Sequence, residues 1–217
     1  MNAVRRRRTI VAVTISVVGI LALLVGVGVY GLLRGPSATR NSATPTSSDT
    51  IAPTTAPVAE PRPLAPSPHS EVFARTVAAR LFTWDTRSSA GPSEWAQVLI
   101  DVGDDEEVAG LASDVRAYLP SPEQWEQIST YGTRQWLTIG SVRVPDSWAT
   151  AVAQAAPGQL PPGAIAYTIA GTRHRAGTWA DQPTTTESAV TFTVFIACPR
   201  AEDCRLLRLS RLDEPLG

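Results

Sequence analysis

Lysine is absent from this chain of 217 residues, and all 19 of its basic residues are arginine. The chain also has one methionine, two cysteines and two histidines. Exclusive use of arginine reflects codon bias in a GC-rich genome more than a physical requirement. A zinc site needs four ligands, mostly Cys and His, and His69 and His174 do not make up such a set with the cysteines. We therefore expect no metal site.

Clustered positive charge is also missing from the C-terminal two thirds of the chain. Residues 71–217 contain 12 Arg against 18 Asp and Glu, a net charge of −6. Such a surface repels phosphates, whereas nucleic-acid binding depends on clustered cations. This composition excludes direct nucleic-acid binding as the primary function.

The patterns of a catalytic centre are absent as well. We find no nucleophile–base pair, glycine-rich phosphate loop or metal-ligand set, and Asp85 and Asp146 merely flank aromatic residues. An acidic cluster, Asp101 with residues 104–107, lacks the spacing and central glycine of a calcium loop. Because acidic residues suit the positive end of a helix dipole, we interpret the cluster as the start of a helix. The sequence predicts a protein with no catalytic residues and no cofactor.

A long apolar run lies near the amino end. Arg5–Arg8 precede the uncharged run Thr9–Leu33. As a helix, this run would be roughly 37 Å long, against a hydrocarbon core of about 30 Å. Arginines collect on the cytoplasmic side of a span. We therefore predict a cytoplasmic tail (1–8), a transmembrane helix through the lipid bilayer (9–33), and an extracellular remainder on a single-pass protein of the cell membrane.

A cleaved signal peptide is the alternative to this anchor. Its apolar region is usually about 7–15 residues long and ends in a small-x-small site, whereas the run here is longer and residues 35–40 fit such a site poorly. The anchor is therefore favoured. Within it, Ala22 and Gly26 form a small-xxx-small pair that would let two helices approach closely, which is compatible with a homo-oligomer.

Residues 34–70 have the composition of a linker. They contain eight prolines among Ser, Thr and Ala, with almost no large apolar side chain. Such a segment buries too little surface to offset the entropy of ordering. We predict a disordered linker that, fully extended, reaches about 110 Å and lifts the following domain off the membrane.

The remaining residues, 71–217, are predicted to form one extracytoplasmic domain of α+β class. Two buried faces are predicted from helical spacing: Phe73, Val77, Leu81 and Trp84 within 70–84, and Val108, Leu111, Val115 and Tyr118 within 105–119. Ser121–Gln124 is a capping box with Pro at the first helical position. After Gly132 the apolar period changes to two. Helices are predicted at 70–84, from 91, at 105–119, from 121 and at 148–155, and strands at 136–144, 164–174, 188–198 and 205–212. Helices followed by a curved, four-stranded antiparallel sheet give a cystatin-like, nuclear-transport-factor-like cone.

Cys198 and Cys204 stand at the two ends of the turn in the last predicted hairpin. Thiols outside the membrane meet an oxidising environment. We predict a disulfide in preference to free thiols or a metal site. A loop this short gains only about 2 kcal/mol from the bond.

Several blocks carry a resemblance to a known family. They are Phe73–Arg75 through Trp84–Arg87, then Thr133–Leu137, Val144–Trp148 and Cys198–Leu212. At these blocks the chain resembles actinobacterial TcpC-like conjugal transfer membrane proteins and, more remotely, the inner-membrane scaffold of type IV secretion systems. The resemblance implies a scaffold without catalytic residues whose partners are other envelope proteins of a transfer or secretion channel. TcpC-type proteins often have two cone domains, and this chain has room for one.

Five residues are candidate partner contacts. Arg173, His174 and Arg175 are adjacent at the end of the second predicted strand, where they would form an anion or partner contact or else a solvated hairpin tip. Of six tryptophans, Trp84, Trp95, Trp125 and Trp136 fall on the apolar phase of their elements, whereas Trp148 and Trp179 lie in connections and are predicted to be exposed.

We therefore expect a structural or assembly component of a conjugative transfer apparatus. Two alternatives remain open. Exposed tryptophans would suit a cell-wall-facing module that binds glycan or protein, and the anchor-and-cone layout also occurs in accessory proteins of actinobacterial lipid import.

Overall fold

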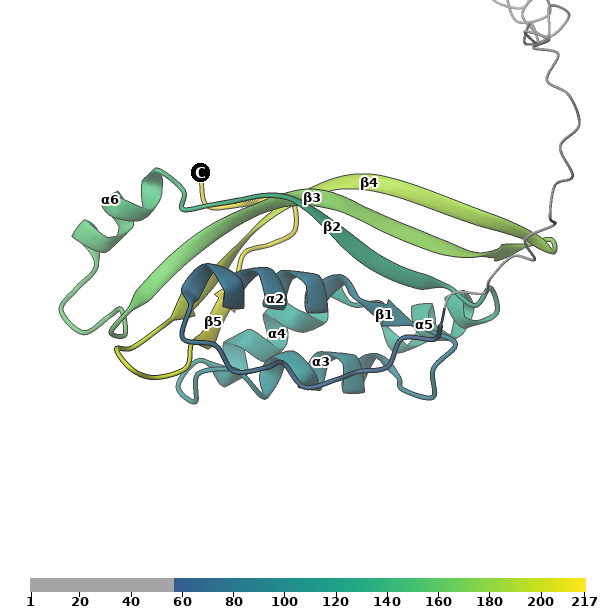
Figure 1. The fold of residues 1–217 in the computed structure, drawn as a ribbon, viewed down its shortest axis with the longest axis horizontal. Coiled ribbons are helices and arrows are strands. Elements are labelled where there is room, and N and C mark those ends of the chain that lie inside the picture. The colour runs from purple at the N-terminus through teal and green to yellow at the C-terminus, as the bar shows by residue number, and fades with distance from the viewer. Residues whose placement is uncertain (1–56) are drawn as a thin grey trace, which may run out of the picture. The chain divides into compact units, whose positions relative to one another are not determined.

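The computed structural model describes residues 57–217 (Figure 1). The predicted cytoplasmic tail, transmembrane helix and first part of the linker lie outside these residues. Within 57–217, no helix is long and apolar enough to cross a membrane. The described residues form a mixed α+β domain in which the main helices lie on one face of a curved antiparallel sheet (Figure 1).

Five helices occur in the described part of the chain, close to the five that were predicted. They are α2 (Ser70–Phe82), α3 (Pro92–Ile100), α4 (Val108–Tyr118), α5 (Pro122–Ser129) and α6 (Ser147–Gln154). The predicted capping box of α5 is confirmed. Ser121 Oγ accepts a hydrogen bond from the Gln124 amide at 3.2 Å, and Gln124 Oε1 accepts one from the Ser121 amide at 3.0 Å.

The sheet has five strands instead of the predicted four. They are β1 (Trp84–Asp85), β2 (Arg134–Arg143), β3 (Ala164–Trp179), β4 (Gln182–Ala197) and β5 (Arg205–Leu209), hydrogen-bonded in that order. The additional strand is β1, which pairs with Gln135 and Arg134 of β2. Two residues are too few to give an alternating pattern, and the predicted helix 70–84 included Trp84, the first of them.

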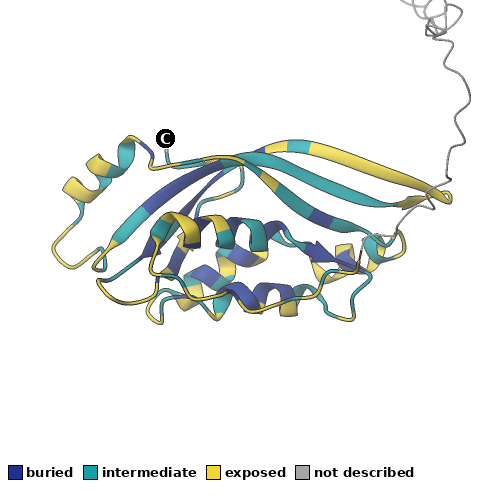
Figure 2. Ribbon diagram, viewed as in Figure 1, coloured by how far each residue is buried: buried dark blue, intermediate teal, exposed yellow. Residues whose placement is uncertain are grey.

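The hairpin of β3 and β4 is longer than predicted. Strand β3 does not end at His174; it continues to Trp179 and pairs with β4 along its full length. The end of this hairpin, residues 176–185, extends past α5 and is hereafter called the arm (Figure 1). The outer half of β4 is exposed (Figure 2). Because solvent reaches this segment, it is rich in threonine and lacks the apolar alternation by which strands are recognised.

The core lies between the helices and the sheet. Helix α2 contributes Phe73, Val77 and Leu81, and α4 contributes Leu111 and Val115, all as predicted. A second cluster joins the buried tryptophans of β1, α3 and α5: Trp84, Trp95 and Trp125.

Trp136 does not belong to this core, contrary to the prediction. Gln135, Leu137 and Ile139 face the helices, so Trp136 lies on the opposite face of β2 and is only half-buried. There it stacks on His174. The register of β2 shifts between Ile139 and Ser141, which brings Val142 back against the core.

The acidic cluster does not cap α4. This helix begins at Val108, and Glu107 at its N-cap makes no side-chain capping bond. Instead, Asp104 Oδ1 accepts a hydrogen bond from the Glu106 amide at 3.0 Å. Residues 104–107 therefore form a turn before the helix. Val108, predicted to face the core, is 39% exposed.

Residues 57–69 lie against the domain, although their composition assigned them to the linker. Leu64 is 5% exposed and packs in the core. The Ala59 amide donates to Asp85 Oδ2 at 3.2 Å, and the Cys204 amide donates to the Ser67 carbonyl at 2.9 Å. These residues therefore pack with the domain, although they precede its predicted start at residue 71.

The predicted disulfide is present. Cys198 and Cys204 are bonded, with a Cα–Cα distance of 4.1 Å. The bond closes the connection between β4 and β5, as the position of the two cysteines in the sequence indicated.

Candidate partner-binding site

A hollow of about 230 Å³ lies where the arm meets the loop between α5 and β2. We call it the arm hollow. Its walls come from two stretches more than forty positions apart in the chain. The lining residues are Ile128, Tyr131, Thr133, Arg175, Ala176, Gly177, Thr178, Trp179, Thr184 and Thr186.

An aromatic pair forms one side of the hollow. The rings of Tyr131 and Trp179 are 5.0 Å apart with an interplanar angle of 34°. Trp179 is 62% exposed and Tyr131 is 39% exposed. The Thr178 amide donates to the Tyr131 carbonyl at 2.8 Å. A Cβ at Gly177 would lie 2.9 Å from that carbonyl, so glycine is needed for this close approach.

Arg173 and Arg175 lie on the same face of β3, because side chains two positions apart on a strand point the same way. Arg175 Nε donates to Gln135 Oε1 at 2.8 Å, and its guanidinium lies 5.6 Å from the Trp84 ring centre. Arg173 Nε donates to Ser188 Oγ at 3.1 Å. Neither arginine forms an ion pair with a carboxylate of residues 57–217.

The electrostatic environment of Arg175 is unfavourable for its charge. Burial of the side chain and the positive charge of the neighbouring Arg173 both lower the pKa of the Arg175 guanidinium. Arginine nevertheless stays protonated in proteins. Among residues 57–217, the partners of this cation are therefore a neutral amide oxygen and a ring face, and a carboxylate would improve the balance of charge.

His174 lies on the other face of β3, so the three adjacent residues do not form one site. Its ring stacks on Trp136 at 5.0 Å with an interplanar angle of 7°. His174 Nε2 is 2.9 Å from Thr138 Oγ1, and Nδ1 is 3.1 Å from Glu187 Oε1.

This order of hydroxyl, imidazole and carboxylate is also the order in hydrolase triads. Here it runs across a strand face with Thr138 and Glu187 exposed. Neither the arm hollow nor the larger groove described below includes any of the three side chains. The geometry is that of a cross-strand polar ladder.

Trp148 lies apart from Trp179. It is half-buried on α6, in the connection between β2 and β3, and its ring is 6.2 Å from that of Phe195. Of the five predicted contact residues, the structure therefore brings only Arg175 and Trp179 into one hollow, with Arg173 beside them on the same face.

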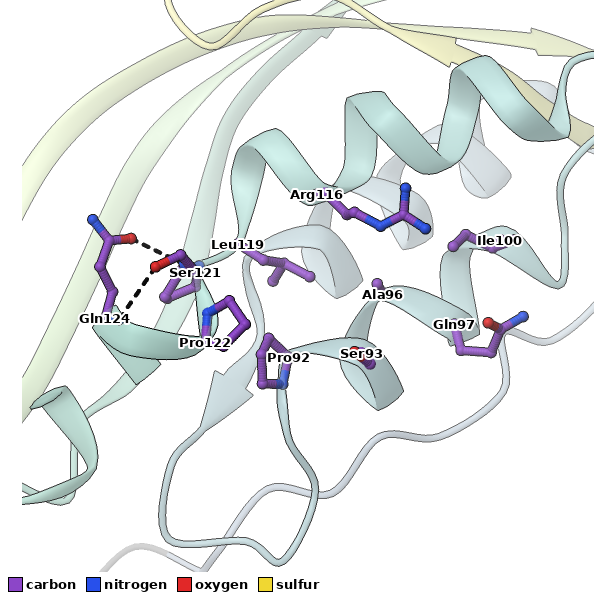
Figure 3. A pocket seen from close by; sticks show the side chains of 11 residues that line it. Pro92, Ser93, Ala96, Gln97, Ile100, Arg116, Leu119, Ser121, Pro122 and Gln124 are labelled. Atoms are coloured by element: carbon purple, nitrogen blue, oxygen red, sulfur yellow. Dashed lines mark hydrogen bonds between the residues drawn. The ribbon is translucent and has the colours of Figure 1, made fainter. Parts of the chain in front are cut away.

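A larger groove of about 530 Å³ runs between the helices (Figure 3). Its lining is mainly apolar, with Ala96 and Ile100 of α3 on one side and Leu119 and Arg116 on the other (Figure 3). It contains no carboxylate or histidine. Across the described residues, no three His, Cys, Asp or Glu side chains are grouped so that they could hold a metal ion.

Sequence reasoning missed several residues of the arm hollow. Tyr131, Thr184 and Thr186 carry no local motif, and Gln135, which binds Arg175, lies before the predicted strand and was named only in the block Thr133–Leu137. What brings them together is the pairing of β2 with β3 and of β3 with β4. A signal for this grouping is absent from any single stretch of the chain.

No family model matches the chain, and no curated protein matches it. Among solved structures, it is similar to a periplasmic fragment of TraM, with 13% identity and a TM-score of 0.38. The match covers 64% of this chain and 92% of that fragment. Similarity at this level does not establish a shared family or function.

Proposed function

We propose that this protein is a non-catalytic, single-pass membrane protein whose outer domain is a structural and assembly component of a conjugative transfer apparatus of the type IV secretion kind. In this proposal the domain is a cystatin-like, nuclear-transport-factor-like cone that binds other envelope proteins. The sequence blocks that resemble TcpC-like proteins, and the order of anchor, linker and domain, support the conjugative context.

The assembly role rests on one observation, the arm with its hollow. None of the residues 173–188 belongs to the two core clusters, so this part of the hairpin is not explained by the stability of the core. Its Trp179 forms an exposed aromatic pair with Tyr131, and its Arg175 has no carboxylate partner among residues 57–217. Aromatic residues and arginine are the residues enriched at protein interfaces.

Deletion of residues 71–217 tests this function. We expect DNA transfer to be abolished while the remaining segment still inserts into the membrane, as measured by mating assay and membrane fractionation. Transfer at the wild-type rate in the deletion strain would refute the proposal.

A wall-facing glycan-binding module is the second candidate, because Trp179 and Tyr131 are exposed in a hollow that four threonines also line. Aromatic rings combine an apolar face with polar edges and would stack on sugar rings. Co-sedimentation with purified peptidoglycan distinguishes this candidate: glycan binding predicts retention that is lost in Trp179→Ala, and assembly predicts no retention of either protein.

A further inference from the structure

The arm hollow has a counterpart of opposite charge at the other end of the domain. Asp105 and Glu106 lie at the exposed turn before α4. Among residues 57–217, no hydrogen bond or ion pair involves their carboxylates. We call this segment the acidic turn. The negative charge of this turn is complementary to the positive charge of Arg173 and Arg175. These arginines also have no ionic partner in the described part of the chain.

The two features cannot meet within one molecule. The acidic turn is fixed to the β5 end of the sheet, because the Asp104 amide donates to the Leu206 carbonyl at 3.0 Å and Leu206 pairs with Ile196 of β4. The arm hollow includes Thr184, near the opposite end of the same strand. At about 3.3 Å per residue, the stretch from Thr184 to Ile196 is about 40 Å long.

We propose that copies of this protein associate head to tail, with the acidic turn of one copy bound in the arm hollow of the next. The carboxylates of Asp105 and Glu106 contact the guanidinium of Arg175 and lie between the threonine hydroxyls and the aromatic pair. The second copy thus supplies the anionic half of a site that is incomplete in one molecule. Because the two surfaces differ, the contact is heterologous and generates a ring or a filament.

This inference rests on the proposed role of the arm as an assembly surface and names its partner. The observation that supports head-to-tail association is charge complementarity between the two surfaces. A domain with a net charge of −6 tends to repel its copies, so association needs a local cation, and Arg173 and Arg175 are available on one face. The hollow, at about 230 Å³, is of a size that suits one or two side chains and not a folded element.

Reciprocal variants test the contact in the full-length protein purified in detergent. In the hollow variant Thr184→Glu/Thr186→Glu, two exposed positions that line the arm hollow become anionic without alteration of Arg175. In the turn variant Asp105→Arg/Glu106→Arg, the acidic turn becomes cationic. We expect each variant alone to self-associate at least tenfold more weakly than the wild type in sedimentation velocity. We expect an equimolar mixture to associate again, because the unaltered arm of one meets the unaltered turn of the other.

Two matched controls accompany these variants. Thr184→Gln/Thr186→Gln changes the size of the side chains without charge, and Glu202→Arg/Asp203→Arg makes the same charge change at another exposed turn. We expect both to retain wild-type association, within about twofold. None of these substitutions alters residues 9–33, so any pairing of the predicted transmembrane helices would be unaffected.

Three results would overturn the inference: a monomeric wild type, association that neither variant weakens, or variants that do not associate when mixed. The last result would indicate a symmetric contact between two arms or two turns. Any of these outcomes, combined with loss of transfer on deletion of the domain, would leave the proposed function standing without this partner.

Discussion

Among single residues, Asp85 has the most demanding position in the domain. Its side chain is 1% exposed. Arg87 donates to it from Nη2 at 2.6 Å, from Nε at 2.9 Å and from its backbone amide at 3.0 Å, and the Ala59 amide donates at 3.2 Å. This carboxylate therefore joins the segment before α2 to β1. Such a group is stable only while these donors remain in place.

Replacement of Asp85 by Asn should lower the free energy of unfolding at pH 7 by about 2 kcal/mol, since it removes an ion pair and leaves donors poorly matched. Urea unfolding followed by tryptophan fluorescence measures this change. Asp146→Asn is the matched control: Asp146 is exposed, and its substitution should change stability by less than about 0.5 kcal/mol. An equal loss in the two variants would show that the buried pair contributes nothing specific.

The same pair gives a defined pH dependence. Burial raises the pKa of Asp85, but hydrogen bonds from the side chain and backbone of Arg87 and from Ala59 outweigh burial and hold the pKa below its ordinary value. A lowered pKa in the folded state contributes stability above the unfolded pKa of about 3.9, and this contribution is lost as pH falls through the folded value. The difference between wild type and Asp85→Asn should therefore shrink as pH falls below about 4.

Residue burial was predictable where it followed a clear period. The helical spacing of Phe73, Val77 and Leu81 identified the buried face of α2 correctly. Trp136 shows the limit, because β2 carries apolar residues on both faces and the sequence gives no rule for choosing between them. The face of β2 that packs on the helices carries Gln135, whose Nε2 donates to the Phe82 carbonyl at 3.1 Å. A buried amide with a specific backbone partner has no signature in a hydrophobic pattern.

At the scale of elements, local signals succeeded and long-range pairing did not. The start of α5 followed from its capping box, because all of its interactions lie within four residues. The predicted end of the second strand, at His174, was wrong. Residues 175–187 are stabilised by cross-strand hydrogen bonds and not by an apolar face. A strand that buries neither face has the composition of a loop.

The turn of the arm combines two residues in an uncommon backbone conformation. Ala180 and Asp181 have φ of 47° and 60°. Two-residue hairpin turns with both residues in this region favour Asn-Gly, because residues other than Gly, Asn and Asp are strained there. Ala180 is therefore an unfavourable residue at the end of the arm.

Ala180→Gly should stabilise the arm by about 1 kcal/mol, a roughly fivefold change in its opening equilibrium. Because the arm lies outside the core, the effect should appear as slower amide hydrogen exchange in residues 176–185 and not in the core strands. Ala189→Gly is the control, since Ala189 lies in extended backbone within β4, where glycine is destabilising. Faster exchange in Ala180→Gly would contradict the strain argument.

At the scale of the whole molecule, the two ends of the sheet differ in the described residues. The end with the connection between β4 and β5 is closed by a covalent bond, and the end with the arm (176–185) is open. At the closed end, the disulfide and the Ser67 carbonyl fix the connection between β4 and β5. Residues 57–69 run from Asp85 at β1 to this connection, so they link the two ends. The α+β class followed from the order of patterns in the sequence, but this link did not, because its proline-rich composition is that of a linker.

The open end provides a test that separates folding from assembly. Ala176 and Thr185 are directly paired in the hairpin, so residues 177–184 can be replaced by Asn-Gly, which closes a two-residue hairpin. The shortened protein loses the contact of Tyr131 with Trp179 and the hydrogen bond of the Thr178 amide, but no member of either core cluster. It should therefore keep the circular dichroism spectrum of the wild type and unfold within about 1 kcal/mol of it. We expect DNA transfer to fall at least tenfold, because the assembly surface has been removed while the domain remains.

The control keeps the arm at full length and changes only its turn, by Ala180→Asn/Asp181→Gly. This control protein should transfer DNA at the wild-type rate. Normal transfer by the folded, shortened protein would show that partners bind elsewhere on the domain, with the apolar groove between α3 and α5 the next surface to alter.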